Sequence, residues 1–276
     1  MMKKSVNQWC FPAHTPVAEI FQVASAAGLD GVELNLNQPG DVGLTMETSA
    51  AEAKSLKKTA NARSLELSSL SCGLMWGTPL SSGDEEVRKR ANLIVRKQLE
   101  LASAMEMSTI LVVPGMVDEG TPYEECWHRS QEQLADLADY AATLGVRIGI
   151  ENVWNRFLLS PPEMIRFIEE IGSPAVGAYF DVGNVVNFGF PDHWIRSLGK
   201  RILKVHVKDF STRVGNIHGF VPLLAGDVNW PRVMTALRDV GYDDYLTAEI
   251  SPYSGDAHQA IRDASNQMSA IIAMTK

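Results

Sequence analysis

Three carboxylates and one imidazole stand at or near the ends of four apolar runs in the second half of the sequence. They are Glu151 in IGIE, Asp181 in AYFD, His206 in ILKVHVKD and Glu249 in LTAEI. Three carboxylates held close together repel one another and raise one another's pKa values, and a divalent cation removes that penalty. Oxygen-rich ligation with a single imidazole suits Mn²⁺, Mg²⁺ or Co²⁺ better than a structural zinc site, which favours thiolates. The residue types therefore predict a site for one divalent metal ion.

The separations between these four residues are 30, 25 and 43 positions, each about one strand-plus-helix unit. Polar residues at the C-terminal ends of parallel barrel strands meet at one mouth, where (β/α)8 barrels carry their active sites. A lone carboxylate at a strand end is often only a helix cap or a salt-bridge partner. Four such residues on successive strand ends are hard to attribute to chance, so we expect them to converge.

The elements that must position these residues alternate along the whole chain. Eight short apolar runs are separated by longer segments with helical periodicity, and the runs are 6–10, 31–34, 65–70, 110–114, 147–151, 176–181, 202–207 and 246–250. Several runs lack polar alternation, as expected for parallel strands covered on both faces. One helical stripe comprises Leu134, Leu137, Ala138, Ala141 and Leu144, at the spacing of an amphipathic helix. Glycines suited to helix C-caps follow four segments, at Gly28, Gly145, Gly172 and Gly241.

Eight strand–helix units in 276 residues favour a closed barrel over an open, doubly wound sheet. No G-x-G-x-x-G motif follows the first apolar run, which removes the main motif for a dinucleotide-binding alternative. No linker-like or low-complexity stretch divides the sequence. We therefore expect an α/β protein built as a single (β/α)8 TIM barrel domain spanning residues 1–276.

Composition restricts the partners and the compartment. The formal net charge of −8 and a pI near 5.3 argue against a nucleic-acid or anionic-membrane partner. The three cysteines, Cys10, Cys72 and Cys126, include no C-x-x-C pair, so a reducing compartment is expected. The N-terminus MMKKSVNQWCFP lacks the apolar core of a signal peptide, and no apolar run reaches the length of a membrane span. The expected location is the cytoplasm.

Several short motifs resemble one superfamily. ENVWNRF around Glu151, FDVGN around Asp181, HVKD around His206 and AEISPY around Glu249 are similar to those of the sugar isomerase/epimerase superfamily, which has a xylose-isomerase-like barrel. The segment LLAGDVNWPRVMTALRDVGYDDYLTAEI resembles the corresponding loop and last strand of the ketose 3-epimerases, such as tagatose 3-epimerase and L-ribulose 3-epimerase. The resemblance covers nearly the whole chain in architecture and is motif-specific from Glu151 to Glu249.

The resemblance implies a metal-dependent isomerase of carbohydrate metabolism. Glu151, Asp181, His206 and Glu249 would bind one metal, Mn²⁺ above all, with Co²⁺, Mg²⁺ or Zn²⁺ as alternatives. Glu151 and Glu249 would also transfer the proton, through a metal-bound cis-enediolate of a sugar or sugar phosphate. Return of the proton from the opposite face gives ketose 3-epimerisation, whereas transfer to the adjacent carbon gives aldose–ketose isomerisation. Relatives are often homodimers or homotetramers, so the resemblance implies one of these states for this chain.

Five further residues are candidates for contacting the sugar: Lys208, Asn184, Arg156, Trp76 and His14. Lys208 follows His206 by two positions, so both side chains point to the same side of a strand; a plain salt bridge is its alternative role, as it is for Arg156. Trp76, together with Trp9 and Trp154, could line a sugar site or only pack at the rim. Glu33 is a candidate for orienting the ligand histidine.

Two departures from the 3-epimerase pattern bear on the substrate. Leu158 stands where these enzymes commonly have a glutamate that contacts sugar hydroxyls, and Asn184 stands where many have histidine. The sugar end near these residues should therefore differ. A phosphate site also stays open, because the loop after the seventh run holds Lys208, Arg213 and Gly215 but SPYSGDAHQ after the eighth holds no lysine or arginine.

Three other functions compete with the isomerase. A cyclitol (inosose-type) dehydratase could use the same barrel and metal site, but it needs a positioned general acid for loss of water. An apurinic-site endonuclease would need about three metals and several more histidines at strand ends than His206, and the acidic charge disfavours DNA. A non-catalytic sugar-binding barrel would have no need of four intact ligands.

Overall fold

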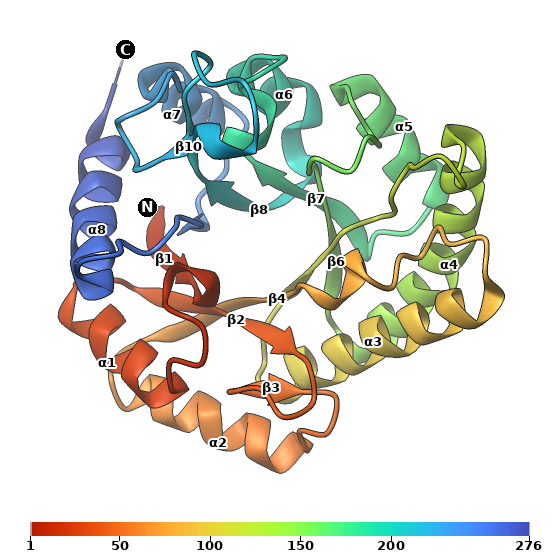
Figure 1. Cartoon of the computed structure of the whole chain (residues 1–276), viewed down its shortest axis with the longest axis horizontal. Helices are drawn as coiled ribbons and strands as arrows, with labels where there is room; N and C mark the ends of the chain where they lie inside the picture. Colours follow the sequence, from red (N-terminus) through yellow and green to blue (C-terminus); the bar gives the residue numbers. More distant parts are fainter. Residues whose placement is uncertain (1, 276) are drawn as a thin grey trace.

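The structure is a computed structural model that describes residues 2–275. Its centre is a closed barrel of parallel strands, joined in the order β1–β11–β8–β7–β6–β5–β4–β2 and closed by pairing of β2 with β1. Figure 1 looks onto the barrel and shows the helices arranged around it. The eight barrel strands are β1 (Lys3–Asn7), β2 (Gly31–Asn37), β4 (Glu66–Cys72), β5 (Thr109–Val112), β6 (Arg147–Glu151), β7 (Val176–Asp181), β8 (Ile202–Val207) and β11 (Tyr245–Ala248). The predicted TIM barrel is confirmed.

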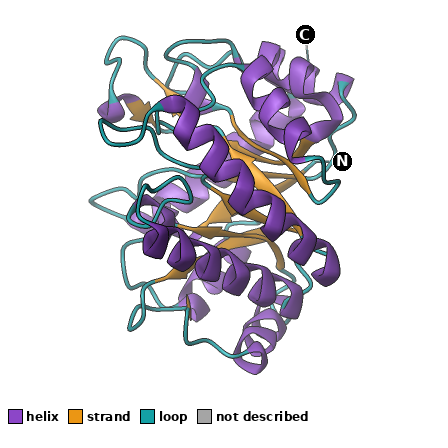
Figure 2. Ribbon diagram, turned by 90° about the vertical axis from the view of Figure 1, so that its right-hand side faces the viewer, coloured by secondary structure: helices purple, strands orange, loops and turns teal. Residues whose placement is uncertain are grey.

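A helix follows each barrel strand and covers its outer side, so that the strands lie inside a helical layer (Figure 2). The helices are α1 (Val17–Ala26), α2 (Ala50–Asn61), α3 (Glu85–Ala104), α4 (Tyr123–Leu144), α5 (Pro161–Ile171), α6 (Pro191–Leu198), α7 (Trp230–Asp239) and α8 (Ala257–Ala273). Apolar residues of both layers form one buried core. None of the described helices combines the length and the apolar character needed to cross a bilayer.

Short strands and 3₁₀ turns lie in the connections between the barrel strands and the helices. They are η1 (Gln8–Cys10), β3 (Leu44–Thr45), η2 (Leu74–Trp76), η3 (Gly183–Val185), η4 (Gly199–Arg201), β9 (Asp209–Phe210), η5 (Ile217–Gly219) and β10 (Phe220–Val221). β9 and β10 pair antiparallel, forming a small ribbon directly after β8. This ribbon matters for the site because it begins one residue beyond Lys208.

The strand ends differ from the prediction in the first half of the barrel. The first strand lies three residues earlier than the 6–10 run, because Asn7 ends it by accepting a hydrogen bond from the Trp9 N–H (2.6 Å) and starts the η1 turn. β2 continues three residues beyond Leu34, so Glu33 lies inside the strand and not at its end. The predicted boundaries follow the apolar runs of the sequence, whereas the hydrogen-bond ladder sets the actual strand ends.

The other boundaries agree more closely. β6, β7 and β8 coincide with the predicted runs, and β4 is displaced by one or two residues. β5 ends two residues early, and β11 ends at Ala248, so Glu249 lies one residue past its strand. Its backbone N–H still donates to the Val207 carbonyl oxygen (3.2 Å), which holds Glu249 beside β8.

Glycine ends the helices where the sequence predicted it. Gly145 after α4 and Gly172 after α5 have φ values of 67° and 71°, and Gly28 and Gly241 also have positive φ. This left-handed conformation is costly for a residue with a Cβ atom.

We expect Gly145→Ala to lower the free energy of unfolding by about 1–2 kcal/mol, because alanine must adopt the left-handed conformation there. Urea denaturation followed by circular dichroism measures the change. Gly255→Ala is the matched control, since a Cβ atom there meets open space without a positive φ. Equal stability of the two variants would contradict this account of the helix end.

Candidate metal centre and active site

Glu151, Asp181, His206 and Glu249 converge at one mouth of the barrel. One ligand atom from each of the four lies within 4.8 Å of the others. Glu151 and Asp181 are the last residues of β6 and β7, and the parallel register sets Asp181 beside His206 of β8. Thr247 of β11 pairs with His206 on the other side, which brings Glu249 to the same level. The barrel register therefore assembles the cluster that the sequence spacing predicted.

The His206 ring is oriented by Glu33. Its Nε2 atom lies 2.6 Å from Glu33 Oε1, deep in the barrel. Its Nδ1 atom faces the carboxylates, at 3.0 Å from Glu249 Oε2, 3.5 Å from Glu151 Oε1 and 3.9 Å from Asp181 Oδ2. A carboxylate on one ring nitrogen fixes the tautomer that leaves the other nitrogen free to bind a metal. The expected orienting role of Glu33 agrees with this geometry.

Glu33 is itself held by three neutral donors. The Asn7 amide (2.6 Å), the Ser69 hydroxyl (2.7 Å) and the Tyr179 hydroxyl (2.5 Å) all donate to its carboxylate. Burial alone would raise the pKa of Glu33, but the His206 ring and these hydroxyl donors lower it below its ordinary value. Gly149 makes room for Tyr179, since a Cβ atom there would lie 2.9 Å from the Tyr179 Cβ. Glu33 is thus a fixed, ionised partner of His206.

The pKa values of the cluster show the cost of crowding charge in a buried place. Burial raises the pKa of Glu151 to about 7 and also raises that of Asp181. Burial acts on Glu249 in the same direction, yet Lys208 and His206 outweigh it and bring the pKa of Glu249 to about 2. Neighbouring positive groups therefore stabilise the negative charge of Glu249 more than that of Glu151.

Two buried atoms aimed into the cluster have no hydrogen-bond partner among the described residues. They are Asp181 Oδ2 and His206 Nδ1. Buried polar atoms nearly always make hydrogen bonds, and buried atoms that make none commonly face an ion or a water molecule. Three carboxylates and one imidazole, with two of their ligand atoms making no hydrogen bond, fit a single divalent ion.

Lys208 forms ion pairs inside the site. Its Nζ atom lies 3.0 Å from Glu249 Oε1 and 3.3 Å from Asp181 Oδ2. Burial would lower the pKa of Lys208, but the surrounding carboxylates raise it, so the ammonium stays charged. Lys208 therefore forms the salt bridges that were one of its two expected roles, and it also borders the cavity described next.

A cavity of about 320 Å³ adjoins the cluster. It is lined by Trp9, Cys72, Trp76, Leu111, Val113, Glu151, Val153, Trp154, Asn184, Lys208, Ile217, Phe220 and Glu249. Trp154 packs against Phe210 and Phe220 of the β9–β10 ribbon, with ring centroids 5.5 Å away in both cases. Mostly apolar walls with a few convergent polar groups are typical of small-molecule sites.

The family comparison agrees with this geometry. Residues 21–271 match the family model described as xylose isomerase-like TIM barrel. The chain belongs to this family. The resemblance seen in the sequence motifs is thereby confirmed.

Several similar proteins have named activities. A putative L-ribulose-5-phosphate 3-epimerase of Escherichia coli is 28% identical over 80% of this chain and 78% of its own. An L-ribulose 3-epimerase of Mesorhizobium japonicum is 27% identical over 81% of this chain and 71% of its own. An uncharacterised protein of Methanocaldococcus jannaschii is 27% identical, with 61% of this chain matched to 59% of that protein's length.

Solved structures show the same fold. An L-ribulose 3-epimerase superposes with a TM-score of 0.82 at 19% identity, covering 99% of this chain and 95% of its own. A D-psicose 3-epimerase superposes with a TM-score of 0.80 at 20% identity, covering 98% of each chain. These proteins and the two relatives with named activities are sugar epimerases, which belong to the isomerase class.

The remaining candidates lie at different places in the barrel. Trp76 is 44% exposed and lines the cavity at its rim, while Asn184 is buried in its wall. Arg156 is exposed and lies outside that lining, as does the buried Leu158. His14 is exposed, lies 3.7 Å from Asp41 and borders a separate cavity of about 140 Å³. The structure thus gathers Trp76 and Asn184 around the metal site, but not Arg156 or His14.

Asn184 also holds the candidate ligand Asp181 in place. Its N–H donates to Asp181 Oδ1 (2.8 Å), and its side-chain amide donates to the Asn152 carbonyl oxygen (2.9 Å). Asn152 in turn accepts from the Asp181 N–H and donates to the Asp181 carbonyl oxygen, both at 2.8 Å. Asn152, Ser69 and Tyr179 were absent from the sequence candidates. Their one signal was a polar group within or just after an apolar strand, a signal shared by many structural residues.

We expect Glu33→Gln to weaken Mn²⁺ binding by about 10–100-fold, because an amide at this position loses the charge that orients His206. Isothermal titration calorimetry on chelator-treated protein measures the affinity. Glu119→Gln is the control, since Glu119 is an exposed loop residue. An unchanged Mn²⁺ affinity in Glu33→Gln would show that Glu33 does not act on the ligand histidine.

The pKa of Glu151 predicts how pH affects the metal-free protein. The unfolded pKa is near 4.5 and the folded pKa is about 7, so the folded state binds the extra proton between these values. This stabilisation is present at low pH and is lost as pH rises through 7, at a cost on the order of 2–3 kcal/mol. Urea denaturation in chelator at pH 5 and pH 8 should show the loss in the native sequence and a much smaller one in Glu151→Gln. Equal pH dependence of the two proteins would refute the prediction.

Proposed function

We propose that this protein is a divalent-metal-dependent ketose 3-epimerase. The observation that carries the proposal is the pair of carboxylates, Glu151 and Glu249, on the same four-residue cluster beside a cavity of sugar size. β6 and β11 are separated around the barrel by β7 and β8, so the two carboxylates reach the cluster from different directions. Such an arrangement suits removal of a proton from one face of a carbon and its return to the other.

The metal would be held by Glu151, Asp181, His206 and Glu249, and we assign Mn²⁺ as the native ion. When bound, a divalent ion supplies a Lewis acid that stabilises negative charge developing on the ketose oxygens. We also propose that the protein is located in the cytoplasm and forms a homodimer or homotetramer.

The two glutamates have environments that separate their affinities for protons. Lys208 lies beside Glu249 and favours its ionised form, whereas Glu151 is more enclosed and holds a proton more readily. A pair of carboxyl groups with separated pKa values can act as a general base and a general acid. One of the two glutamates would remove the proton at C3, and the other would deliver one to the opposite face.

The cavity walls assist this transfer. Trp9, Trp154 and Phe220 line the cavity and limit access of water to the reacting carbon. Lys208 and Asn184 are placed to contact sugar oxygens, and Trp76 would cover one side of the sugar. The activities named for the relatives, on L-ribulose and its 5-phosphate, act at C3 and support epimerisation over aldose–ketose isomerisation.

Exchange in D₂O tests the reaction directly. Chelator-treated protein restored with Mn²⁺ is incubated with free ketoses and ketose phosphates, and NMR follows deuterium and products. We expect deuterium at C3 together with the C3 epimer, and a loss of about 10²–10⁴-fold in rate for Glu151→Gln and Glu249→Gln. Glu119→Gln should retain the activity.

Other products would replace the proposal. Deuterium entering at C1 or C2 with an aldose product would indicate isomerisation. A dehydrated product from a cyclitol would instead indicate the dehydratase reaction.

A further inference from the structure

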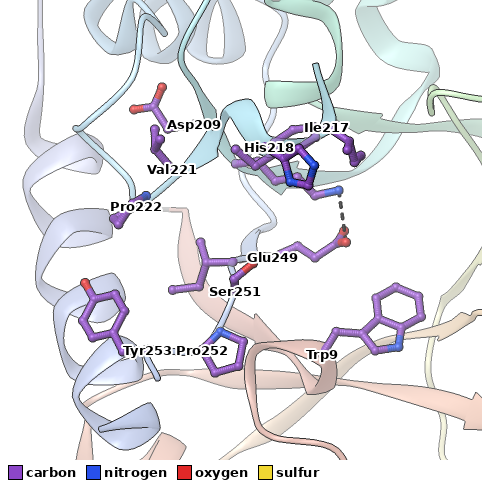
Figure 3. A pocket seen from close by; sticks show the side chains of 13 residues that line it. Trp9, Asp209, Ile217, His218, Val221, Pro222, Glu249, Ser251, Pro252 and Tyr253 are labelled. Atoms are coloured by element: carbon purple, nitrogen blue, oxygen red, sulfur yellow. Dashed lines mark ion pairs between the residues drawn. The ribbon is translucent and has the colours of Figure 1, made fainter. Parts of the chain in front are cut away.

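A second, larger cavity continues from the metal site beyond Glu249. Its volume is about 620 Å³, and it shares Trp9, Lys208, Ile217, Phe220 and Glu249 with the smaller cavity. Lys208 borders this cavity, and Figure 3 shows Glu249 on its wall with Tyr253 farther along. A molecule whose reacting carbon lies beside Glu249 can therefore extend into this space.

The two volumes differ in what they can hold. Small-molecule sites span about 300–1,000 Å³, so a cavity near 320 Å³ suits a single sugar unit. The larger cavity is about twice that volume and adjoins the same catalytic carboxylate. A free monosaccharide would leave this second space without a sugar group.

The walls of the larger cavity combine apolar surface with scattered neutral donors and acceptors. Ile250, Pro252 and Tyr253 come from the segment after β11, and Val221 and Pro222 come from the β10 segment across from it (Figure 3). Ser251 and Tyr253 add hydroxyls, which are neutral polar groups, to these walls. Faces of this kind suit a sugar ring, whose carbon–hydrogen faces pack on apolar groups while its hydroxyls bond to polar ones.

The charges of the wall do not suit a phosphate. Within the described chain, Lys208 is the one lysine or arginine that borders this cavity, and its ammonium is already paired with Glu249 and Asp181. Asp209 borders it too, with its carboxylate occupied by the Trp230 indole N–H and by backbone N–H groups of Phe210 and Val228. The remaining group able to become cationic is the exposed His218.

We propose that the substrate is a ketose carrying an uncharged glycosyl group, with the ketose in the smaller cavity and the second sugar ring in the larger one. This proposal rests on the epimerase function proposed above and names its substrate class. It gives a reason for the departure at Leu158, because recognition of the substrate would move from that loop to the walls formed by the β10 segment and by residues 250–253.

Matched substrates test the inference. D-Fructose, fructose 6-phosphate, and 1-O- and 6-O-α-D-glucopyranosyl-D-fructose are compared by C3 exchange with Mn²⁺-loaded protein. We expect kcat/KM for at least one glucosyl ketose to exceed that for D-fructose by about tenfold or more, because binding of the remote ring assists the reaction. Fructose 6-phosphate should show no such gain.

Two variants locate the second ring. Val221→Trp fills the larger cavity and should lower the ratio of kcat/KM between the glucosyl ketose and D-fructose by about tenfold. Val214→Trp is the matched control, since Val214 is an exposed valine of the β9–β10 connection outside the lining and should leave the ratio unchanged. Tyr253→Ala should lower the same ratio, because it removes a side chain from the cavity wall. This variant replaces Val221→Trp in the test if the tryptophan variant fails to fold.

The outcomes separate this inference from the proposed function. If no ketose, free or substituted, exchanges at C3, the epimerase function fails and the inference fails with it. If D-fructose or its phosphate exchanges as fast as both glucosyl ketoses, only the inference is overturned. An equal effect of Val221→Trp and Val214→Trp on the ratio would also overturn it.

Discussion

The repulsion among three buried carboxylates is the constraint on which this structure depends. Glu151, Asp181 and Glu249 are brought within a few ångströms of one imidazole by strands whose positions are fixed by the barrel. Lys208 offsets part of the negative charge, mainly at Glu249. The negative charge of Glu151 and Asp181 is less well compensated, and a divalent cation would neutralise it. A rigid barrel can maintain such an unfavourable cluster because its large apolar core provides stability elsewhere.

The polar network beneath the cluster also compensates buried charge, deeper in the barrel. His206 can present Nδ1 toward the metal position only because Nε2 is bound to Glu33. Glu33 remains ionised in the interior because the His206 ring lies against it and the hydroxyls of Ser69 and Tyr179 donate to it. The charge at the mouth is thus supported by residues from four different strands. This explains why so many polar side chains occupy the otherwise apolar interior of this barrel.

The chemistry and the recognition of substrate are supplied by different parts of the fold. The four residues of the cluster lie on strand ends, inside a strand or next to one, where the hydrogen-bond ladder limits their movement. The cavity walls come largely from loops: η1 with Trp9, the segment after Glu151 with Trp154, the β9–β10 ribbon and residues 250–253. A barrel of this kind can therefore keep one cluster at its strand ends while its loops change the shape of the cavity.

The sequence by itself determined the barrel and the residues of its centre. Burial on both faces makes parallel strands apolar throughout, and helices carry a periodic stripe, so alternation of the two patterns predicts the fold. The four polar residues stood out because each interrupts or ends an apolar run at the period of the repeat. Glu33 also stood out, although its strand continues beyond it.

Only the tertiary structure decided which other polar residues take part. Tyr179 and Ser69 lie in different strands, 110 positions apart, and meet at Glu33 through the register of the closed barrel. Arg156 and His14 had motif and loop positions as promising as Asn184 and Trp76, yet their side chains lie away from the metal cluster. The larger cavity depends on how the β10 segment and residues 250–253 fold over the mouth. Loop paths follow from long-range packing, and no local periodicity in the sequence records them.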